Sequence, residues 1–236
     1  MATVILLRHG RTTANTAGVL AGRAGGVRLD RAGRAQAAAA AERLASVRLA
    51  SVRTSPLHRC RETASPVAGA AGVPLVNDHG LVECDYGEWT GRPIKELVRD
   101  RQWRVVQRQP SAMVFPGGES LTAMLARAAE AVRRQDRAVE EEHGPEAVWL
   151  ACTHGDVIKA LLADALGLHL DLFQRIQVDP ASVSLVRYTD ERPYVLGVNT
   201  LGGDLGWLTP PKRRRGRRRT HDAVVGGGAG PATGPD

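Results

Sequence analysis

Two histidines of this sequence occupy the same local setting. His9 follows the apolar run "VILLR" and precedes Gly10, and His154 follows "VWLACT" and precedes Gly155. Continuous apolar runs of this length are typical of buried strands, and ligands of open α/β sheets bind beyond the carboxyl ends of the strands. We therefore expect both imidazoles at that edge of a sheet, facing each other if their strands are neighbours.

The glycine after each histidine has a physical reason. Neither Gly10 nor Gly155 carries a Cβ, so a ligand or another backbone segment can approach closely. Gly155 also precedes a predicted helix that starts near Asp156. A helix N-terminus presents free N–H groups and the positive end of the helix dipole, which together suit an anion.

Arginines near these positions fit the same anion. Arg8 directly precedes the first histidine, and Arg59 and Arg61 lie in the first turn of the helix predicted for residues 57–72. Guanidinium groups bind phosphate through paired hydrogen bonds. One of the two helix arginines can face the site while the other faces solvent, and spacing alone does not decide between them.

Glu83 completes the candidate set, in the glycine-containing loop 80–92. A carboxylate near two arginines and two histidines suits proton transfer to or from a leaving group. The whole set predicts phosphoryl transfer without a metal, in which a histidine accepts the phosphoryl group and cationic groups stabilise its oxygens. Metal binding by the two histidines is the main rival. It lacks an H-x-H, H-x-x-x-H or carboxylate triad, and the arginines would repel a cation.

The candidate residues must be positioned by secondary structure, and the sequence predicts strands that alternate with helices. A loop is predicted at 10–28, strands at 3–8, 51–55, 73–77, 146–155, 182–188 and 194–199, and helices at 29–47, 57–72, 93–107, 119–143 and 156–167. Such alternation predicts an α/β fold, in which a parallel-dominated sheet is covered by helices on both faces.

Composition is that of a globular protein, with 43% hydrophobic residues in 236. No apolar stretch is long enough to span a bilayer, and the N-terminus lacks a basic region, so we expect a cytoplasmic protein. Three widely spaced cysteines suggest neither a disulfide framework nor a zinc site. They are Cys60, Cys84 and Cys152.

The net charge of +7 is concentrated at one end of the sequence. Residues 209–236 hold seven Lys and Arg against two Asp, which leaves 25 basic and 23 acidic residues in 1–208. We expect a catalytic domain over 1–208 and a disordered tail over 209–236. The run "KRRRGRRR" at 212–219 could bind nucleic acid or an anionic surface, but a solvated extension is the favoured interpretation.

Five motifs in order resemble the histidine phosphatase (phosphoglycerate mutase-like) superfamily. They are "RHGRTTAN", "SPLHRCRETA", "LVECDYGEWTG", "PGGES" and "THGDVIKAL". The resemblance implies that superfamily's three-layer sandwich, with a mostly parallel central sheet. It also implies roles for particular residues: His9 as the phosphorylated residue, Arg8, Arg59 and His154 as the rest of the phosphate pocket, Glu83 as the general acid, Gly155 as a backbone donor, Asn15 and Thr12 lining the phosphate or substrate, Gly22 touching substrate, and Arg61 facing away.

Two features favour hydrolysis over a mutase reaction. Asp156 stands where the mutases usually have asparagine, and residues 92–110 hold no adjacent basic pair. We therefore expect a metal-independent phosphomonoester hydrolase, working through phosphohistidine on small phosphorylated metabolites without a cofactor. A phosphoglycerate mutase-type phosphomutase is the alternative, and a nucleic-acid or membrane-surface binder acting through the tail is a third hypothesis. The particular substrate and the oligomeric state, a homo-oligomer included, stay open.

Overall fold

A computed structural model describes residues 2–203 and residue 205 of the chain. The predicted tail, 209–236, with its basic run 212–219, lies outside the described residues. Within the described part, no helix is both long and apolar enough to cross a membrane.

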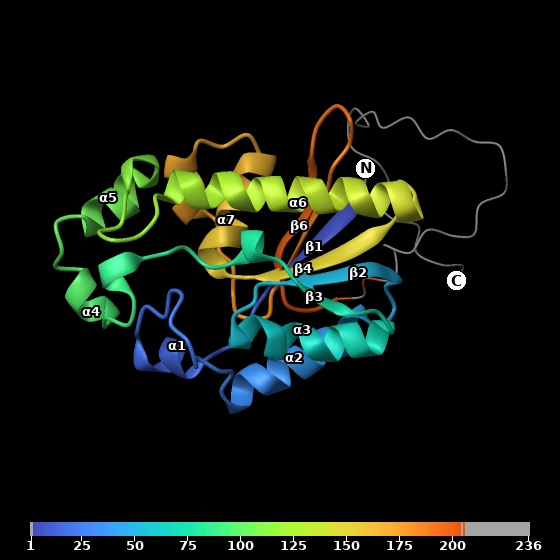
Figure 1. Ribbon diagram of the computed structural model, residues 1–236, viewed down its shortest axis with the longest axis horizontal. Coiled ribbons are helices and arrows are strands. Elements are labelled where there is room, and N and C mark those ends of the chain that lie inside the picture. The colour runs from blue at the N-terminus through green and yellow to red at the C-terminus, as the bar shows by residue number, and fades with distance from the viewer. Residues whose placement is uncertain (1, 204, 206–236) are drawn as a thin grey trace, which may run out of the picture.

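The centre of the molecule is a mixed sheet. Its strands are β1 (Thr3–Arg8), β2 (Leu49–Thr54), β3 (Leu75–Asn77), β4 (Val148–Thr153), β5 (Val183–Arg187) and β6 (Tyr194–Thr200). They lie in the order β3-β2-β4-β1-β5-β6 (Figure 1). The strands β3, β2, β4 and β1 are parallel to one another, whereas β5 is antiparallel to both β1 and β6. The prediction of a mostly parallel sheet is therefore confirmed, and the two late strands are neighbours.

Helices cover both faces of the sheet. The helices are α1 (Thr13–Ala17), α2 (Arg31–Leu44), α3 (His58–Ala71), α4 (Ile94–Leu97), α5 (Trp103–Arg108), α6 (Leu121–His143) and α7 (Gly155–Ala165). Figure 1 shows α2 and α3 below the sheet and the long α6 above it, with α7 on the same side as α6. This is the predicted three-layer arrangement.

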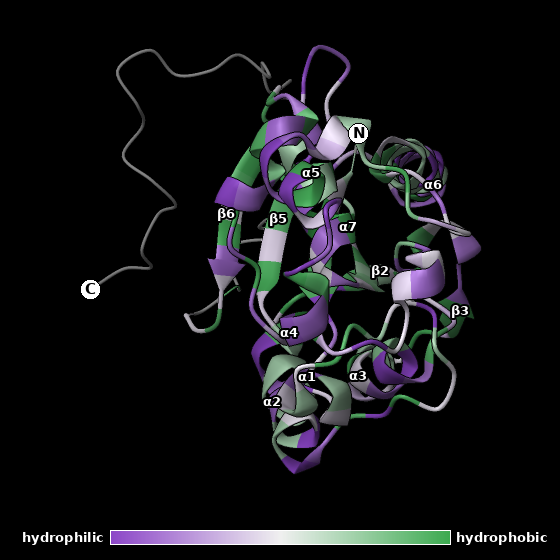
Figure 2. Cartoon of the chain, turned by 90° about the vertical axis from the view of Figure 1, so that its left-hand side faces the viewer, coloured by the Kyte–Doolittle hydropathy of each residue, from purple (hydrophilic) through white to green (hydrophobic). Residues whose placement is uncertain are grey.

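The apolar run of β1 is continuous because both of its faces are buried. Val4 and Leu6 pack into the core beneath α6 and α7, while Ile5 and Leu7 pack into the core formed with α2 and α3. Alternate side chains of a strand point to opposite faces, so a central strand covered on both sides has no polar position. The same reason explains the hydrophobic colour along much of β5 in Figure 2.

Two predicted segments differ from the observed structure. The loop predicted at 10–28 contains the short helix α1, because Thr12 and Asn15 form a reciprocal capping box at its start. The single helix predicted at 93–107 is divided into α4 and α5. Asp100 lies between them, and its carboxylate accepts the Gln102 N–H at 2.9 Å, a local turn that competes with the helix.

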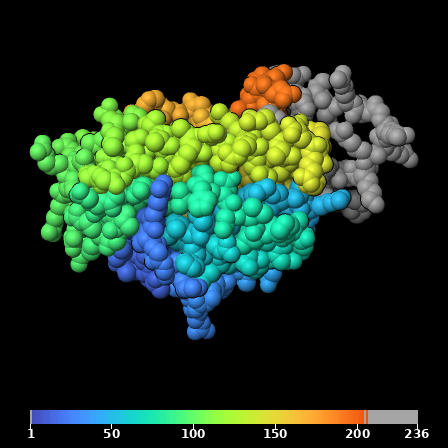
Figure 3. Space-filling view, viewed as in Figure 1, coloured from blue at the N-terminus to red at the C-terminus, as the bar shows by residue number. Residues whose placement is uncertain are grey.

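Two loops from distant parts of the sequence meet near the carboxyl ends of the strands. The segment between α1 and α2 pairs with the segment before α4. The Leu20 N–H donates to the Arg92 carbonyl, and Val19 forms an isolated antiparallel β-bridge with Pro93. Figure 3 shows the α1–α2 loop in blue, rising to the green residues at the start of α6. These loops border the site described next.

Candidate active site

The two histidines meet at the carboxyl ends of neighbouring strands. β1 and β4 pair in parallel with Arg8 opposite Thr153, so His9 and His154 follow at the same level. Their ring centroids are 5.3 Å apart in an edge-to-face arrangement. The expectation that the imidazoles face each other is confirmed.

The His9 ring presents a lone pair at one of its nitrogens. Its Nδ1 lies 2.8 Å from the Gly10 carbonyl, which can only accept, so Nδ1 carries the hydrogen. Nε2 is then an acceptor, and the Arg59 Nε donates to it at 3.3 Å. Burial first, and then the charges of Arg59 and Arg8, hold the pKa of His9 well below its usual value. The imidazole is therefore neutral at physiological pH, which is the form that can act as a nucleophile.

The His154 ring has the opposite tautomer. Its Nε2 lies 2.8 Å from the Ser55 hydroxyl, and its Nδ1 lies 3.1 Å from Arg59 Nη2, which can only donate. The hydrogen therefore belongs on Nε2. Burial, Arg59 and His9 lower the pKa of His154. Ser55 and Cys60, whose Sγ is 3.4 Å from Nε2, were not assigned to the site from the sequence, although both belong to the "SPLHRCRETA" motif.

Arg8 and Arg59 carry unsatisfied donors into the site. Arg8 Nη1 donates to the Val178 carbonyl at 2.6 Å, and Arg59 Nη2 donates to the Gly22 carbonyl at 2.8 Å. Arg8 Nε and Arg59 Nη1 are buried and have no partner among the described residues. Buried donors without acceptors are costly, and an anion would satisfy both with charge-assisted hydrogen bonds. Arg61 instead turns outward to the Asn77 side chain at 2.7 Å, as expected.

The glycines allow close approaches of three kinds. Gly155 opens α7, and a Cβ there would lie 3.4 Å from Arg8 Nε. Gly10 makes room for backbone, because a Cβ would come within 2.6 Å of the Gly33 carbonyl oxygen. Gly22 has a φ of +50° and turns its carbonyl to Arg59. The structure thus brings Gly22 and Gly155 to the arginines, whereas Gly10 meets α2.

Glu83 lies beside the second histidine, as predicted from the sequence. Its Oε2 is 3.7 Å from His154 Nδ1, and its Oε1 accepts the Cys84 N–H at 3.0 Å. Burial, followed by the negative charge of Asp156, raises the pKa of Glu83 to about 7. A carboxyl group with such a pKa can donate or accept a proton near neutral pH. Asp156 itself accepts the Tyr86 hydroxyl at 2.8 Å, a contact that sequence spacing does not reveal.

Thr12 and Asn15 form contacts with each other. The Thr12 hydroxyl accepts the Asn15 N–H at 3.1 Å and donates to the Asn15 side-chain oxygen at 2.9 Å. Thr12 is buried and Asn15 is exposed. These contacts start α1, and a role of either residue in lining the phosphate or substrate stays a prediction.

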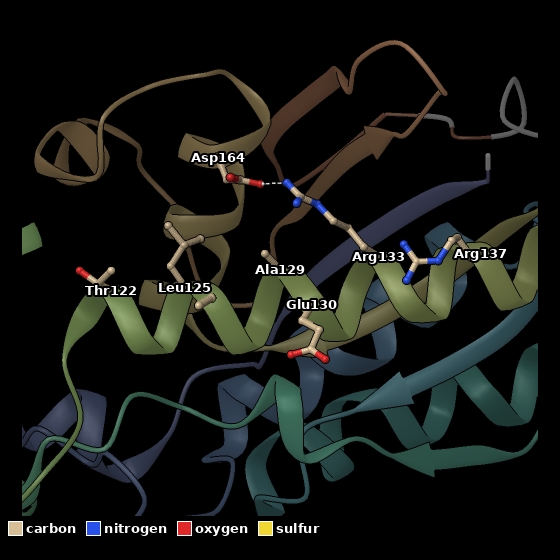
Figure 4. A pocket seen from close by; sticks show the side chains of 8 residues that line it. Thr122, Leu125, Ala129, Glu130, Arg133, Arg137 and Asp164 are labelled. Carbon is tan, nitrogen blue, oxygen red and sulfur yellow. Dashed lines mark hydrogen bonds and ion pairs between the residues drawn. The ribbon is translucent and has the colours of Figure 1, made fainter.

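A separate hollow of about 460 Å³ lies along α6, away from the histidines. Figure 4 shows Arg133 of α6 reaching across it to Asp164 of α7, at 2.6 Å. Its lining includes none of the candidate site residues. Over the described residues, no three His, Cys, Asp or Glu side chains gather in a way that could hold a metal ion.

Comparison of the sequence with known proteins finds one family and several relatives. The model of the histidine phosphatase superfamily (branch 1) matches residues 4–201. A bifunctional protein of Mycobacterium tuberculosis is 36% identical over 203 residues, which cover 84% of this chain and 54% of that protein. The chain thus spans about half the length of this relative. A probable phosphoglycerate mutase of Yersinia pestis is 32% identical over 216 residues, covering 89% of this chain and 97% of the mutase.

Comparison of the structures gives a similar picture. The structure of a mycobacterial glucosyl-3-phosphoglycerate phosphatase in complex with VO3 has a TM-score of 0.76 to this chain at 26% identity. The match covers 84% of this chain and 98% of the phosphatase.

Proposed function

Because the chain belongs to the histidine phosphatase superfamily, branch 1, we propose that it is a phosphomonoester hydrolase that forms a phosphohistidine on His9. One observation carries the proposal. Two buried guanidinium donors without partners, Arg8 Nε and Arg59 Nη1, belong to the residues that flank the Nε2 lone pair of a neutral imidazole. This arrangement suits an anion at a nucleophile, which is what phosphoryl transfer to a histidine requires.

The first step transfers the phosphoryl group to the enzyme. Arg8 and Arg59 hold the phosphate oxygens, and His9 Nε2 attacks phosphorus. The P–N bond forms as the ester P–O bond breaks, and protonated Glu83 gives its proton to the departing alcohol oxygen. His154 Nδ1 accepts Arg59 Nη2 at 3.1 Å and so helps to orient that guanidinium group, and it lies 3.7 Å from Glu83 Oε2.

The second step releases phosphate. A water molecule attacks the phosphorus of phosphohistidine, and Glu83, now a carboxylate, takes a proton from that water. The P–N bond breaks and returns its electron pair to Nε2, so that neutral His9 and protonated Glu83 are restored. The guanidinium groups of Arg8 and Arg59 supply the positive charge in both steps, so the proposed reaction needs no metal.

Hydrolysis is favoured over a mutase reaction by the position of Asp156. Its carboxylate accepts the Tyr86 hydroxyl and acts on the pKa of Glu83, so it adds negative charge next to the general acid. Asp156 stands where the mutases usually have asparagine, and residues 92–110 hold no adjacent basic pair. The Yersinia relative keeps the mutase as the second candidate. We propose small phosphorylated metabolites as the substrate class, as the phosphatase neighbour's name suggests.

The proposal is tested by hydrolysis of p-nitrophenyl phosphate and a metabolite panel in EDTA. We expect His9→Ala to lower kcat/KM by about 10³-fold or more. The exposed histidine at the start of α3 supplies the control, because His58→Ala should retain full activity. Rapid-quench labelling with a ³²P ester should yield an acid-labile adduct on His9. Activity of His9→Ala equal to wild type, or loss of wild-type activity in EDTA, would contradict the proposal. Interconversion of 2- and 3-phosphoglycerate without hydrolysis would favour the mutase.

A further inference from the structure

Both polar groups of the peptide unit that joins Glu83 to Cys84 form hydrogen bonds with side chains. Its carbonyl oxygen accepts Arg23 Nε at 2.9 Å and Arg127 Nη2 at 3.0 Å. Its N–H donates to the Glu83 carboxyl group at 3.0 Å. Because carbonyl and N–H belong to one planar unit, a rotation that frees the carbonyl also moves the N–H that holds the carboxyl. The two arginines therefore act on the orientation of the Glu83 side chain.

One carboxylate holds both arginines. Glu119 Oε1 accepts Arg127 Nη2 at 2.6 Å and Arg23 Nη2 at 2.9 Å, and Oε2 accepts Arg127 Nε at 3.1 Å. Oε1 also accepts the Asp85 N–H at 2.9 Å. Glu119 thus forms a two-point pair with Arg127, the geometry that gives such pairs their strength and direction. Burial alone would raise the pKa of Glu119, but these hydrogen bonds and charges lower it, so the group is ionised.

Arg23, one of the two arginines that Glu119 holds, is next to a residue that contacts Arg59 of the phosphate pocket. Arg23 follows Gly22, whose carbonyl accepts Arg59 Nη2 at 2.8 Å. The loop that carries both residues is the blue segment that reaches the start of α6 in Figure 3, where Glu119 precedes the N-cap residue Ser120. Arg59 is held by the backbone carbonyl of Gly22 and not by the Arg23 side chain, so we expect loss of Glu119 to act on Glu83 rather than on Arg59.

We propose that Glu119 is a positioning residue for the general acid, acting on Glu83 through Arg23 and Arg127. The proposal rests on the proposed function, because Glu83 has an orientation to keep only if it transfers a proton. Glu119 itself touches neither His9 nor His154. Its contribution is to fix two guanidinium groups that would otherwise have several acceptors within reach.

The leaving group distinguishes a positioning role from a merely structural one. An alkyl ester departs as a poor leaving group and needs the proton of Glu83, whereas nitrophenolate departs as a stable anion without one. The constant kcat/KM reports only the steps up to leaving-group departure. We expect Glu119→Gln to lower kcat/KM for glycerol 2-phosphate by about 10- to 100-fold. For p-nitrophenyl phosphate we expect a change below about 3-fold, which also reports that the variant is folded.

Two further variants sharpen the measurement. Glu62→Gln is the matched control, since Glu62 also accepts an arginine and a backbone N–H, from Arg28 and Leu29, without contacting Glu83. It should leave both substrates unchanged. Arg127→Lys keeps the charge but loses the two-point pair, and it should reproduce the selective loss for the alkyl ester. Equal losses for both substrates in a folded Glu119→Gln would overturn the proposal.

Hydrogen exchange tests the positioning without any turnover. The Cys84 N–H contacts Glu83 and not Glu119, so a change in its exchange reports the peptide orientation itself. We expect Glu119→Gln to speed exchange of this amide by about 10-fold or more, measured by ¹⁵N NMR, while amides of α7 keep their rates. Unchanged protection of Cys84 would overturn the proposal even if the protein proved to have no phosphatase activity. Absence of wild-type hydrolysis would overturn the proposed function alone.

Discussion

At the scale of single residues, Asp156 contributes to the raised pKa of its neighbour Glu83. Its negative charge is the second cause, after burial, that raises the pKa of Glu83 to about 7. The carboxylate is fixed by the Tyr86 hydroxyl at 2.8 Å and lies 3.5 Å from Lys159. In the proposed mechanism Glu83 is the general acid and has to hold its proton at the working pH, so we expect the identity of residue 156 to affect the pH range of activity.

Asp156→Asn should therefore make kcat/KM fall at a lower pH on the alkaline side of its pH profile. Removal of the negative charge lowers the pKa of Glu83, so the acid loses its proton at lower pH. We expect kcat/KM for glycerol 2-phosphate at pH 8 to fall about 3- to 10-fold, with little change below pH 6. Ionisation of the substrate affects the variant and the wild type equally, so it cancels in the ratio of their kcat/KM values. Asp164→Asn on the same helix, which removes the ion pair of Figure 4, is the control, and an identical shift in it would contradict the argument.

Glu83 should also make stability depend on pH. A carboxyl group with a raised pKa binds its proton more tightly in the folded than in the unfolded state. Its stabilising contribution is complete below its usual pKa of 4.5 and is lost as pH rises through about 7. Between those values the change is at most about 3.5 kcal/mol, at roughly 1.4 kcal/mol per pKa unit.

Glu83→Gln tests this linkage, because glutamine does not titrate. The free energy of unfolding of the variant, relative to wild type, should rise between pH 4.5 and pH 8. Urea denaturation at several pH values measures it, and the contributions of His9 and His154 are common to both proteins. A difference that stays constant with pH would show that the pKa of Glu83 is not raised in the folded state.

The sequence predicts the site residues whose side-chain types are distinctive. It does not predict the residues that belong to the site only through their contacts in the folded chain. His9, His154 and Glu83 follow from strand ends and a glycine-rich loop. The choice of Arg59 over Arg61 came from the family motif, because two positions in one helical turn are equivalent on spacing alone. Glu119 and Arg127 were not identified. Glu119 belongs to the "PGGES" motif, which was available as a signal, whereas nothing in the sequence distinguishes Arg127 from the other arginines of α6.

At the scale of elements, the contact between α2 and the chain after β1 depends on glycine. A Cβ at Gly33 would lie 1.9 Å from the Arg11 carbonyl oxygen, and one at Gly10 would lie 2.6 Å from the Gly33 oxygen. The first turn of α2 therefore packs directly on the backbone that follows His9. The sequence predicted α2, but not this approach, because helix periodicity contains no information about the surface on which a helix packs.

A pair of glycine substitutions measures that approach. Gly33→Ala should lower the free energy of unfolding by about 1 to 3 kcal/mol, because the new methyl group overlaps backbone that cannot move away easily. Gly69→Ala, inside α3, meets no atom within 4 Å and should raise it by about 0.5 to 1 kcal/mol through helix propensity. Urea denaturation with unchanged m values measures both. A Gly33→Ala protein as stable as wild type would show that the contact is looser than the structure implies.

Element boundaries were predicted less well than element types. Every predicted strand is present, but the predicted helix at 93–107 is two short helices separated by the Asp100 turn. Residues 92–110 contain several good helix formers, so propensity favoured one helix. A single side-chain hydrogen bond to the backbone was sufficient to end it, and that choice is visible only once the local geometry is known.

At the scale of the whole molecule, the order of the strands creates the site. From β1 the chain proceeds through α2 and α3 to β2 and β3 on one face, and it returns through α6 to β4 on the other. This change of face occurs next to β1, and ligands of such sheets bind at that switch point. The crossing explains why two histidines that are 145 positions apart in the sequence have ring centroids only 5.3 Å apart.

The uneven distribution of charge along the sequence suggests a test in which residues 209–236 are removed. Residues 1–208 carry a net charge of about +2, and the family model ends at residue 201, before the basic run. The site is built by β1, β4 and the loops described above, so a chain ending at 208 should keep kcat/KM for small esters within about 2-fold of the full chain. Any salt-dependent binding of DNA should disappear with the deletion, because seven basic residues leave with it, and should persist in His9→Ala. A large loss of hydrolysis in the shortened chain, with its melting temperature unchanged, would instead assign those residues to the substrate.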